Sequence, residues 1–277
     1  MKRKKGYQLI AGATVLSMCV SLVNPVVYAE ESKQDAKVSA GDIKLNPEVH
    51  YQTLKGWGTS LCWWGNIIGS WGDADYNNNG TPDREEIAEL AFSPEYLNLN
   101  IVRYNVGGGD KEDTSIKRCE GIVPGWTEDM TGKKDGTGTF DAETFYNKNT
   151  EEMSDAGQIW MMEQANEYRK DEKDIINEVF SNSPPYYMTK SGTSTGGWNA
   201  ENNLKEECYD DFATYMARAT KWIDNNLEEK YGTGVTYVEP MNEPDTSYWA
   251  AGSTKQEGCT FAPGKAQSEM LSLIHIS

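Results

Sequence analysis

Apolar segments of strand length alternate with amphipathic segments of helical length along the chain. Runs rich in Val, Ile and aromatic residues predict four strands, at residues 54–60, 99–106, 175–182 and 235–240. The clearest helix lies between the third and fourth strands, where apolar residues recur every three or four positions, namely at Phe212, Tyr215, Met216, Ala219, Trp222 and Ile223. This spacing places them on one buried stripe. Strands that alternate with helices predict a parallel α/β sheet, either closed into a barrel or left open.

Two earlier helices and a leading strand complete the expected pattern. Residues 84–91 predict a helix with Thr81 as its N-cap and Pro82 at its first position. Residues 159–170 predict the second helix, and residues 43–51 a short strand.

One connection is unusually long. About fifty residues rich in Gly, Asp and Thr separate the second strand from the next helix, from 107 to 157, whereas such loops usually have ~2–6 residues. In a parallel barrel this loop would lie at the face formed by the carboxyl ends of the strands, where active sites are built. A purely structural elaboration is the alternative.

Residues 1–29 are typical of a signal peptide. A basic start precedes an apolar stretch at 9–27, and Val27-Tyr28-Ala29 has the small residues that suit cleavage after Ala29. The alternative is a membrane anchor, but no stop-transfer charges follow, and the stretch is interrupted by Ser17, Ser21, Asn24 and Pro25. We therefore expect a secreted, extracellular protein with no membrane span in its mature part, which would begin with a flexible polar segment at 30–42.

The charge balance argues against nucleic acid as a partner. The formal net charge is −17 and becomes −21 once the four basic residues of the signal peptide are removed. Such a chain repels phosphate backbones and anionic membranes. Its 9 Trp and 15 Tyr permit a carbohydrate partner, because flat aromatic faces stack on sugar rings, although most buried aromatic residues belong to the core.

Cysteine and histidine give no catalytic or zinc-binding pattern. Four cysteines remain after cleavage, an even number with three possible pairings in an oxidising compartment: Cys62, Cys119, Cys208 and Cys259. His50 and His275 are the only histidines and lie near the two ends, so neither a Ser-His-Asp triad nor a zinc site is expected. The three glycines at 107–109 lack nucleotide-binding spacing. The chemistry is therefore expected from carboxylates, without a required cofactor.

Glu243 is the candidate catalytic carboxylate. It ends the fourth predicted strand within Met241-Asn-Glu-Pro244. Because Pro244 cannot continue a central strand, the side chain of Glu243 is expected at the strand end, towards the top of a barrel.

Four segments carry a family resemblance, namely residues 56–65 (GWGTSLCWWG), 103–109 (RYNVGGG), 181–186 (SNSPPY) and 242–244 (NEP). They resemble glycoside hydrolase family 30 of clan A, and they occur in the order found in that family. The resemblance covers roughly residues 43 to 265. Within the family, Gln256-Glu-Gly-Cys259 and the preceding Tyr248-Trp249 resemble the branch that contains endo-β-1,6-galactanases.

The resemblance implies a fold and a set of site residues. The fold is a (β/α)8 TIM barrel with a side β-domain that includes the N-terminal strand. The chemistry is hydrolysis with retention through two glutamates, in which Glu243 is the general acid/base. Asn242 would bind the sugar 2-hydroxyl and Arg103 would lie near the nucleophile. Further candidates for the sugar subsite are Trp57, Trp63, Tyr186 and Trp249.

Elementary chemistry agrees with these implied roles. A glycosidic oxygen leaves poorly unless an acid protonates it. In a retaining enzyme a second, ionised carboxylate ~5–5.5 Å away attacks the anomeric carbon. Arg103 could keep that carboxylate ionised; a structural ion pair at the strand end is the alternative interpretation of this arginine.

The family's nucleophile ends a seventh strand, and we do not find it in this chain. Residues 56–243 hold four predicted strands and 34 residues follow Glu243, whereas a complete barrel takes ~250 residues. We therefore expect a partial barrel at residues 43–270, truncated after the fourth or fifth unit and inactive alone, with an active full-length parent. Residues 271–277 match nothing expected of the family and are interpreted as a non-native tail.

A calcium loop is a separate hypothesis. Asp75, Asn77, Asn79 and Glu86 fit the positions of an EF-hand pattern around Gly80. The alternative is an Asn-Gly turn that leads into the following helix. The only metal that the sequence suggests is therefore a structural calcium.

Two classes of function remain open at this point. The first is a secreted glycosidase, foremost an endo-acting β-1,6-galactanase on arabinogalactan side chains, with a glucuronoxylanase, a β-1,6-glucanase or a glucosylceramidase-like enzyme as alternatives. The second is a non-catalytic carbohydrate-binding protein. A glutamate at the end of the seventh strand of the parent would favour the enzyme. A calcium-dependent structural module is the weakest interpretation.

Overall fold

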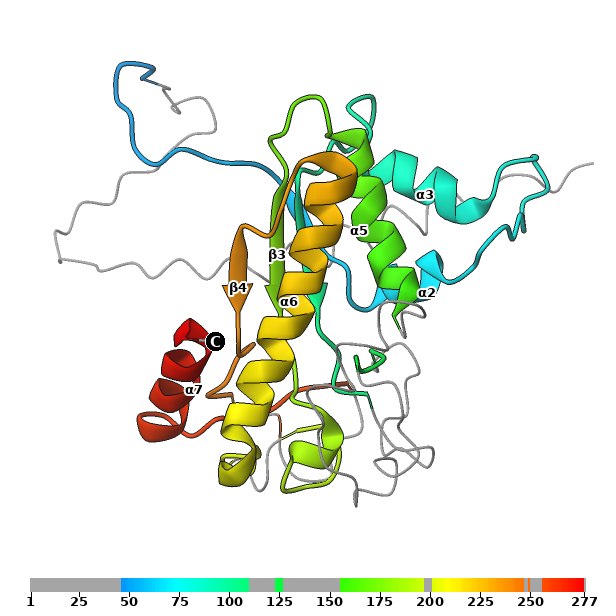
Figure 1. Ribbon diagram of the computed structural model, residues 1–277. Helices are drawn as coiled ribbons and strands as arrows, with labels where there is room; N and C mark the ends of the chain where they lie inside the picture. The colour runs from blue at the N-terminus through cyan, green and yellow to red at the C-terminus, as the bar shows by residue number, and fades with distance from the viewer. Residues whose placement is uncertain are drawn as a thin grey trace, which may run out of the picture. The chain divides into compact units, whose positions relative to one another are not determined.

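The computed structural model describes residues 46–109, 123–126, 155–196, 201–246, 249 and 256–276. The chain divides into two compact units, residues 1–53 and 54–277. All strands and helices described below belong to the second unit (Figure 1).

Four parallel strands form one sheet in chain order. They are β1 (Gly58–Ser60), β2 (Ile101–Asn105), β3 (Ile176–Phe180) and β4 (Tyr237–Glu239). The order confirms the predicted parallel sheet. Because neighbouring strands are parallel, each connection must cross from the end of one strand back to the start of the next. The crossover connections contain helices.

The strand register sorts the side chains onto two faces. Val102, Tyr104 and Val179 are fully buried, and they belong to the same core as the helices. Because side chains alternate along a strand, Arg103 and its register partner Glu178 lie on the other face. The sheet therefore has one apolar face under the helices, and the opposite face, called the polar face below, carries Arg103 and Glu178.

The helices lie in the crossovers and after the last strand. Their bounds are α2 (Trp64–Gly69), α3 (Asp83–Phe92), α5 (Ala156–Tyr168), α6 (Tyr209–Tyr231) and α7 (Lys265–Ile276), with short 3-10 turns η2 (Tyr186–Met188) and η3 (Glu206–Cys208). In Figure 1, α6 and α5 run along the sheet, and α7 lies beside the lower part of α6.

The predicted apolar stripe is the buried face of α6. Phe212, Tyr215, Met216, Ala219 and Ile223 are at most 1% exposed. The helix ends at Tyr231 and is followed by Gly232, whose φ of 63° is left-handed, as is common for a glycine that follows a helix.

A close approach of two glycines joins α2 to the start of α5. A Cβ added to Gly69 would lie 1.9 Å from the carbonyl oxygen of Gly157, and a Cβ on Gly157 would lie 2.3 Å from the carbonyl oxygen of Asn66. Glycine is therefore required on both sides of this contact.

The N-terminal strand prediction is wrong where the structure describes it. Residues 46–51 form a turn and irregular chain instead of a strand. Asn46 explains the turn, since its carbonyl accepts from Val49 N at 3.2 Å and its side chain from Glu48 N at 3.1 Å. Residues 43–45 and the predicted signal peptide lie outside the described residues.

The predicted capping of α3 is also wrong. The N-cap is Pro82, with an extended ψ of 130° and no side-chain cap, and the helix begins at Asp83. The backbone N–H of Asp83 donates to the carbonyl of Ala74 at 2.9 Å. The carbonyl of Ala74, outside the helix, thus takes the capping role that the sequence predicted for the hydroxyl of Thr81.

The sequence pattern does not predict two of the helices, α2 and α7. The sequence of α2 begins and ends with Trp-Gly and Ile-Gly, so its composition is poor for a helix. Helix α7 includes residues 271–276, although the sequence alone suggests a non-native tail there.

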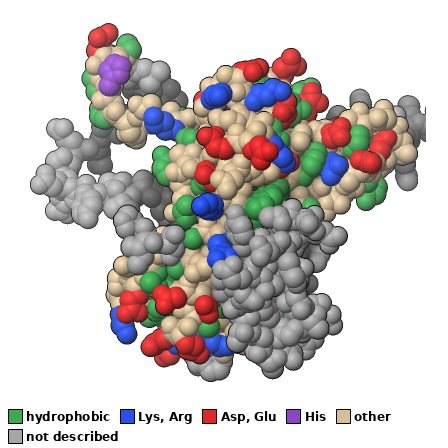
Figure 2. All heavy atoms as spheres, viewed as in Figure 1, with side chains coloured by type: hydrophobic (Ala, Val, Ile, Leu, Met, Phe, Trp, Pro, Cys, Tyr) green, Lys and Arg blue, Asp and Glu red, His purple; other side chains and the backbone are tan. Residues whose placement is uncertain are grey.

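No helix among the described residues is long and apolar enough to cross a membrane. Acidic side chains are spread over the face drawn in Figure 2.

Candidate active site

The predicted calcium loop connects α2 to α3 and is closed by its own hydrogen bonds. The carboxylate of Asp75 accepts from the backbone N–H groups of Asn79, at 3.1 Å, and Gly80, at 2.9 Å. The side-chain amide of Asn77 donates to Glu86 at 2.7 Å, and that of Asn79 donates to the other oxygen of Glu86. The four predicted ligands are therefore neighbours in space.

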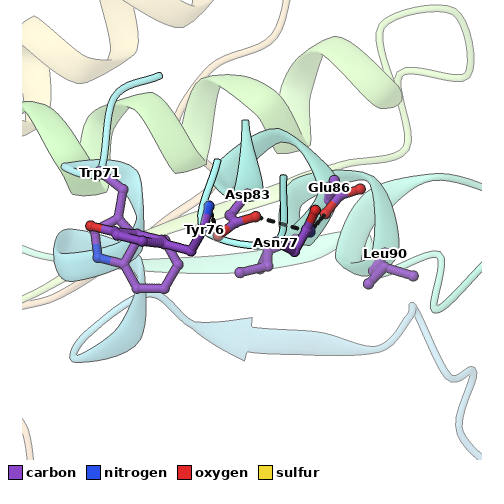
Figure 3. A pocket seen from close by; sticks show the side chains of 7 residues that line it. Trp71, Tyr76, Asn77, Asp83, Glu86 and Leu90 are labelled. Atoms are coloured by element: carbon purple, nitrogen blue, oxygen red, sulfur yellow. Dashed lines mark hydrogen bonds between the residues drawn. The ribbon is translucent and has the colours of Figure 1, made fainter. Parts of the chain in front are cut away.

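A surface pocket of about 350 Å³ adjoins this loop (Figure 3). Its wall includes Trp71 and Tyr76, whose rings meet edge to face with centroids 5.6 Å apart. At the polar side of the pocket, the carboxylate of Asp83 accepts a hydrogen bond from the side-chain amide of Asn77 at 3.0 Å. Within the described part of the chain, no group of three or more His, Cys, Asp or Glu residues is arranged to hold a metal ion, so the calcium site stays a hypothesis.

Asn242 and Glu243 lie in the turn that follows β4. The backbone N–H of Asn242 donates to the carbonyl of Ser181, just after β3, at 3.0 Å. Glu243 is exposed and has a φ of 47°. This left-handed conformation is uncommon for a residue other than glycine and clusters at functional sites. The carboxyl ends of β3 and β4 therefore hold Glu243 at the edge where the sequence predicted it.

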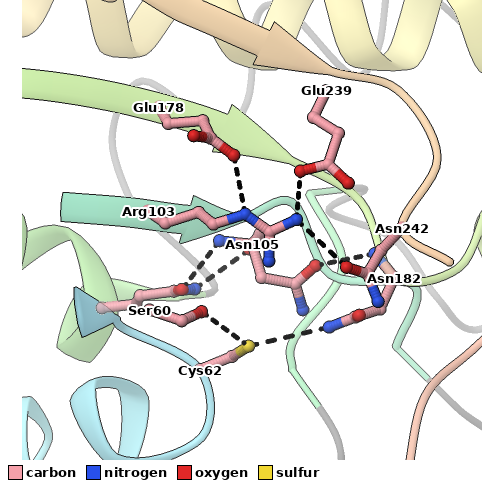
Figure 4. Close-up of polar contacts among 9 residues, drawn as sticks. Ser60, Cys62, Arg103, Asn105, Glu178, Asn182, Glu239 and Asn242 are labelled. Atoms are coloured by element: carbon pink, nitrogen blue, oxygen red, sulfur yellow. Dashed lines mark hydrogen bonds and ion pairs between the residues drawn. The ribbon is translucent and has the colours of Figure 1, made fainter. Parts of the chain in front are cut away.

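Arg103 joins three strands on the polar face of the sheet (Figure 4). Its Nε donates to Oε1 of Glu178 on β3 at 2.7 Å, and its Nη2 donates to Glu239 on β4. The same Nη2 donates to Oδ1 of Asn242 at 3.1 Å. The guanidinium carbon also lies 3.4 Å from the centroid of the Phe180 ring. Arg103 and Asn242 are thus brought together as two of the predicted site residues.

Burial and the neighbouring carboxylate alter the ionisation of Glu239. The pKa of Glu239 is raised above its ordinary value, first by burial and then by the neighbouring Glu178, while Arg103 opposes the shift. Sequence reasoning missed both glutamates as site residues. The sequence contained a signal for both glutamates, because each is a charged residue within a strand.

Glu257 is the centre of a second, buried polar network. Its side chain is fully buried. Oε2 accepts from Nδ2 of Asn105 at 3.0 Å, and Oε1 accepts from the backbone N–H groups of Gly108 and Val123 at 3.2 and 3.0 Å. Oδ1 of Asn105 in turn accepts from the backbone N–H of Asn182 at 3.0 Å. This network ties together the segments that follow β2, β3 and β4.

The cysteines provide no nucleophile in the described part of the chain. Burial raises the pKa of the Cys62 thiol to about 11, so the thiolate is scarce at neutral pH. Its Sγ lies 3.3 Å from Oγ of Ser60 and 3.6 Å from Nδ2 of Asn182. Cys62, Cys208 and Cys259 are free thiols, and Cys119 lies outside the described residues.

The four aromatic candidates for a sugar subsite differ in position. Trp57 is 70% exposed, but its carbonyl accepts from Ile101 N at the first residue of β2. Trp57 therefore lies at the amino end of the sheet, away from Glu243, and the expectation of a subsite role is not supported there. Trp63 follows β1 at the carboxyl end and is half-buried.

Tyr186 and Trp249 are buried. Tyr186 is fully buried, its ring edge to face with Tyr187 at 5.5 Å. Trp249 is 2% exposed, and a Cβ on Gly258 would lie 2.3 Å from its ring. Both side chains pack inside the protein here, so neither presents a face for sugar stacking.

Comparison with known proteins supplies the family. The family described as O-Glycosyl hydrolase family 30 matches residues 40–273. The chain belongs to this family. Its sheet of four parallel strands, with helices in the crossovers, is therefore part of a TIM barrel.

The names of two curated relatives of this family 30 chain refer to β-1,6-linked galactose. An exo-β-1,6-galactobiohydrolase of Bifidobacterium longum subsp. longum is 32% identical over 275 residues, covering 87% of this chain and 17% of that protein. An endo-β-1,6-galactanase of Hypocrea rufa is 29% identical over 249 residues, covering 87% of this chain and 47% of that protein. The chain thus spans less than half the length of either relative.

A solved structure shows the same fold. A conserved exported protein from Bacteroides fragilis superposes with a TM-score of 0.60 at 23% identity, over 83% of this chain and 42% of that protein. At this level of identity the likeness concerns the fold alone.

Proposed function

We propose that this chain is part of a secreted, retaining glycoside hydrolase that cleaves β-1,6-linked galactan side chains, as found in arabinogalactan. The supporting observation is the position of Asn242 and Glu243 at the carboxyl end of β4, with Asn242 fixed by Arg103. Active sites of TIM barrels form at this end of the strands. The β-1,6-galactan substrate rests on the names of the two relatives.

Glu243 is the proposed general acid/base. In the first step it donates a proton to the glycosidic oxygen, so that the leaving sugar departs as an alcohol. In the second step the resulting carboxylate takes a proton from the water that hydrolyses the glycosyl-enzyme. Asn242 is proposed to donate a hydrogen bond to a hydroxyl of the bound sugar.

The nucleophile of a retaining mechanism is a second carboxylate ~5–5.5 Å from the acid. The family resemblance places it at the end of a seventh strand, and the described residues form four strands. We therefore expect this 277-residue chain to hold the acid/base half of the site, and to be inactive without the strand that bears the nucleophile. Secretion is proposed from the N-terminal sequence.

Other substrates of the family and a non-catalytic role remain the competing proposals. A glucuronoxylanase, a β-1,6-glucanase or a glucosylceramidase-like enzyme would use the same Glu243 with different loops. A carbohydrate-binding protein would keep sugar contacts but lack turnover.

The test is an assay of two proteins side by side, this chain and the product of the complete gene that contains it. Both are incubated with β-1,6-galactan, glucuronoxylan and β-1,6-glucan, and products are followed by chromatography and by NMR of the anomeric proton. Release of β-configured galacto-oligosaccharides by the complete product alone supports the proposal. Turnover of another glycan would make that glycan the substrate in place of β-1,6-galactan. Binding without turnover of any glycan would support the proposal of a carbohydrate-binding protein.

A further inference from the structure

The polar face of the sheet contains two carboxylates that the proposed mechanism does not use. Glu178 on β3 and Glu239 on β4 both accept hydrogen bonds from Arg103. Their side chains are 23% and 37% exposed, and that of Arg103 is 24% exposed. The three side chains come from three adjacent strands, so their meeting depends on the strand register.

That register directs the guanidinium towards the carboxyl ends of the strands. Glu178 pairs with Arg103 at the same level of the sheet, whereas Glu239 pairs with Phe180, two residues nearer the carboxyl end. Glu178 binds Nε, the atom nearer the backbone, and Glu239 binds Nη2 at the tip. The ring of Phe180 packs against the guanidinium at 3.4 Å. The side chain is therefore held at both ends of its planar group.

The held guanidinium determines which end of the Asn242 amide faces it. An amide presents an acceptor oxygen on one side and a donor nitrogen on the other. Because Nη2 of Arg103 can only donate, it selects Oδ1 of Asn242, at 3.1 Å. Nδ2 is then the end that faces another partner, and it can donate a hydrogen bond to an acceptor such as a hydroxyl oxygen of a sugar.

We propose that Glu178 and Glu239 are positioning residues, which hold Arg103 so that Asn242 presents Nδ2 to the substrate beside Glu243. This inference rests on the proposed function for its catalytic consequence, but the positioning itself is a property of the structure. Neither glutamate contacts the reacting bond in this role. Both act through Arg103.

A double-mutant cycle in the complete gene product separates positioning from a general structural role. Glu178→Ala is compared in the wild-type background and in the Asn242→Ala background. In the wild-type background kcat/KM on the β-1,6-galactan substrate is expected to fall about 10- to 100-fold, the usual effect of losing a charged hydrogen bond. With Asn242 already removed, Glu178→Ala is expected to cost less than about 3-fold, because the residue through which it acts is gone.

Two further variants control the cycle. Glu178→Gln keeps an oxygen that accepts from Nε of Arg103 and should recover most of the loss. Glu172→Ala removes an exposed glutamate near the start of β3 and should leave kcat/KM unchanged. Equal losses from Glu178→Ala in both backgrounds would overturn the positioning role, since a structural defect does not depend on Asn242.

Crystal structures of the Glu178→Ala and Glu239→Ala variants test the positioning without any turnover. The expected result is that Nη2 of Arg103 lies beyond 3.5 Å from Oδ1 of Asn242 in at least one variant, with the strands unmoved. Retention of that contact in both variants would overturn the inference. If the gene product hydrolyses none of the glycans, the proposed function fails, and the crystal structures still decide the positioning.

Discussion

The carboxylate of Glu257 accepts a hydrogen bond from Nδ2 of Asn105 at 3.0 Å, although 152 residues separate them in the chain. Glu257 is fully buried and takes two more hydrogen bonds from backbone N–H groups. A buried carboxylate is stable only when such donors compensate for the lost water. The contact therefore holds the segment after β4 against the end of β2.

Removing the carboxylate of Glu257 should destabilise the folded protein. Glu257→Ala leaves three buried donors without their acceptor, each of which costs on the order of 1–3 kcal/mol. We expect the free energy of unfolding, measured by urea titration of the complete gene product, to fall by at least about 3 kcal/mol. Glu172→Ala, an exposed glutamate, serves as the matched control and should change it by less than about 0.5 kcal/mol. Equal effects of the two substitutions would contradict this account of Glu257.

Asp155 should make stability depend on pH. Burial raises its pKa from 3.8 to about 7, although Gln158 and Tyr104 donate hydrogen bonds to it. Because the folded state binds the proton more tightly than the unfolded state, this contribution is complete below about pH 4 and is lost as the pH rises to about 7.

The Asp155→Asn variant tests that dependence because its amide does not titrate. Unfolding free energies of the wild type and the variant are measured at pH 4.5 and pH 7.5. Relative to the variant, the wild type should lose a few kcal/mol between these two values, since each unit of pKa shift corresponds to about 1.4 kcal/mol. A constant difference between the two proteins would show that the pKa of Asp155 is not raised.

The contact between α2 and α5 should not tolerate a methyl group. Gly157→Ala would place its Cβ 2.3 Å from the carbonyl oxygen of Asn66, so the helices must separate. We expect a loss of about 1–3 kcal/mol, the usual range for overpacking, seen as a lower thermal midpoint. Gly125→Ala is the control, because its nearest neighbour would lie at an ordinary 3.6 Å. A Gly157→Ala variant as stable as this control would show that the two helices have room to move.

The calcium hypothesis predicts binding by the loop at residues 75–86. Isothermal titration of the complete gene product with millimolar calcium should then give a heat and raise the thermal midpoint. Glu86→Gln should abolish both effects, since Glu86 occupies the last ligand position of the pattern. Glu95→Gln, a change in an exposed glutamate after α3, should leave them unchanged. Titration without heat would remove the hypothesis, and the loop would be an internally bonded turn.

Much of the fold was predictable because its signals are local. The spacing of Phe212, Tyr215 and Met216 gave the buried face of α6, and short apolar runs gave the four strands. The position of Glu243 beyond the end of β4 could be predicted because Pro244 follows it. These features depend only on residues close together in the sequence.

The remainder depends on contacts between distant segments. The pairing of Arg103 with Glu178 and Glu239 requires the register of three strands, which no local pattern specifies. The position of Glu257 beside Asn105 likewise requires the tertiary fold. Tyr186 was expected at the sugar site and is buried, because an aromatic residue in a sequence looks the same in a core and on a binding surface.

The most direct test of the central proposal is the leaving-group dependence of Glu243→Gln in the complete gene product. The variant and the wild type are compared on β-1,6-galactan and on an aryl β-galactobioside whose dinitrophenolate leaves without protonation. If Glu243 is the general acid, the rate of the first step on galactan should fall by about 100-fold or more, while the burst of dinitrophenolate from the aryl substrate stays close to the wild-type rate. Equal losses on both substrates, or no loss on galactan, would contradict the assignment of Glu243.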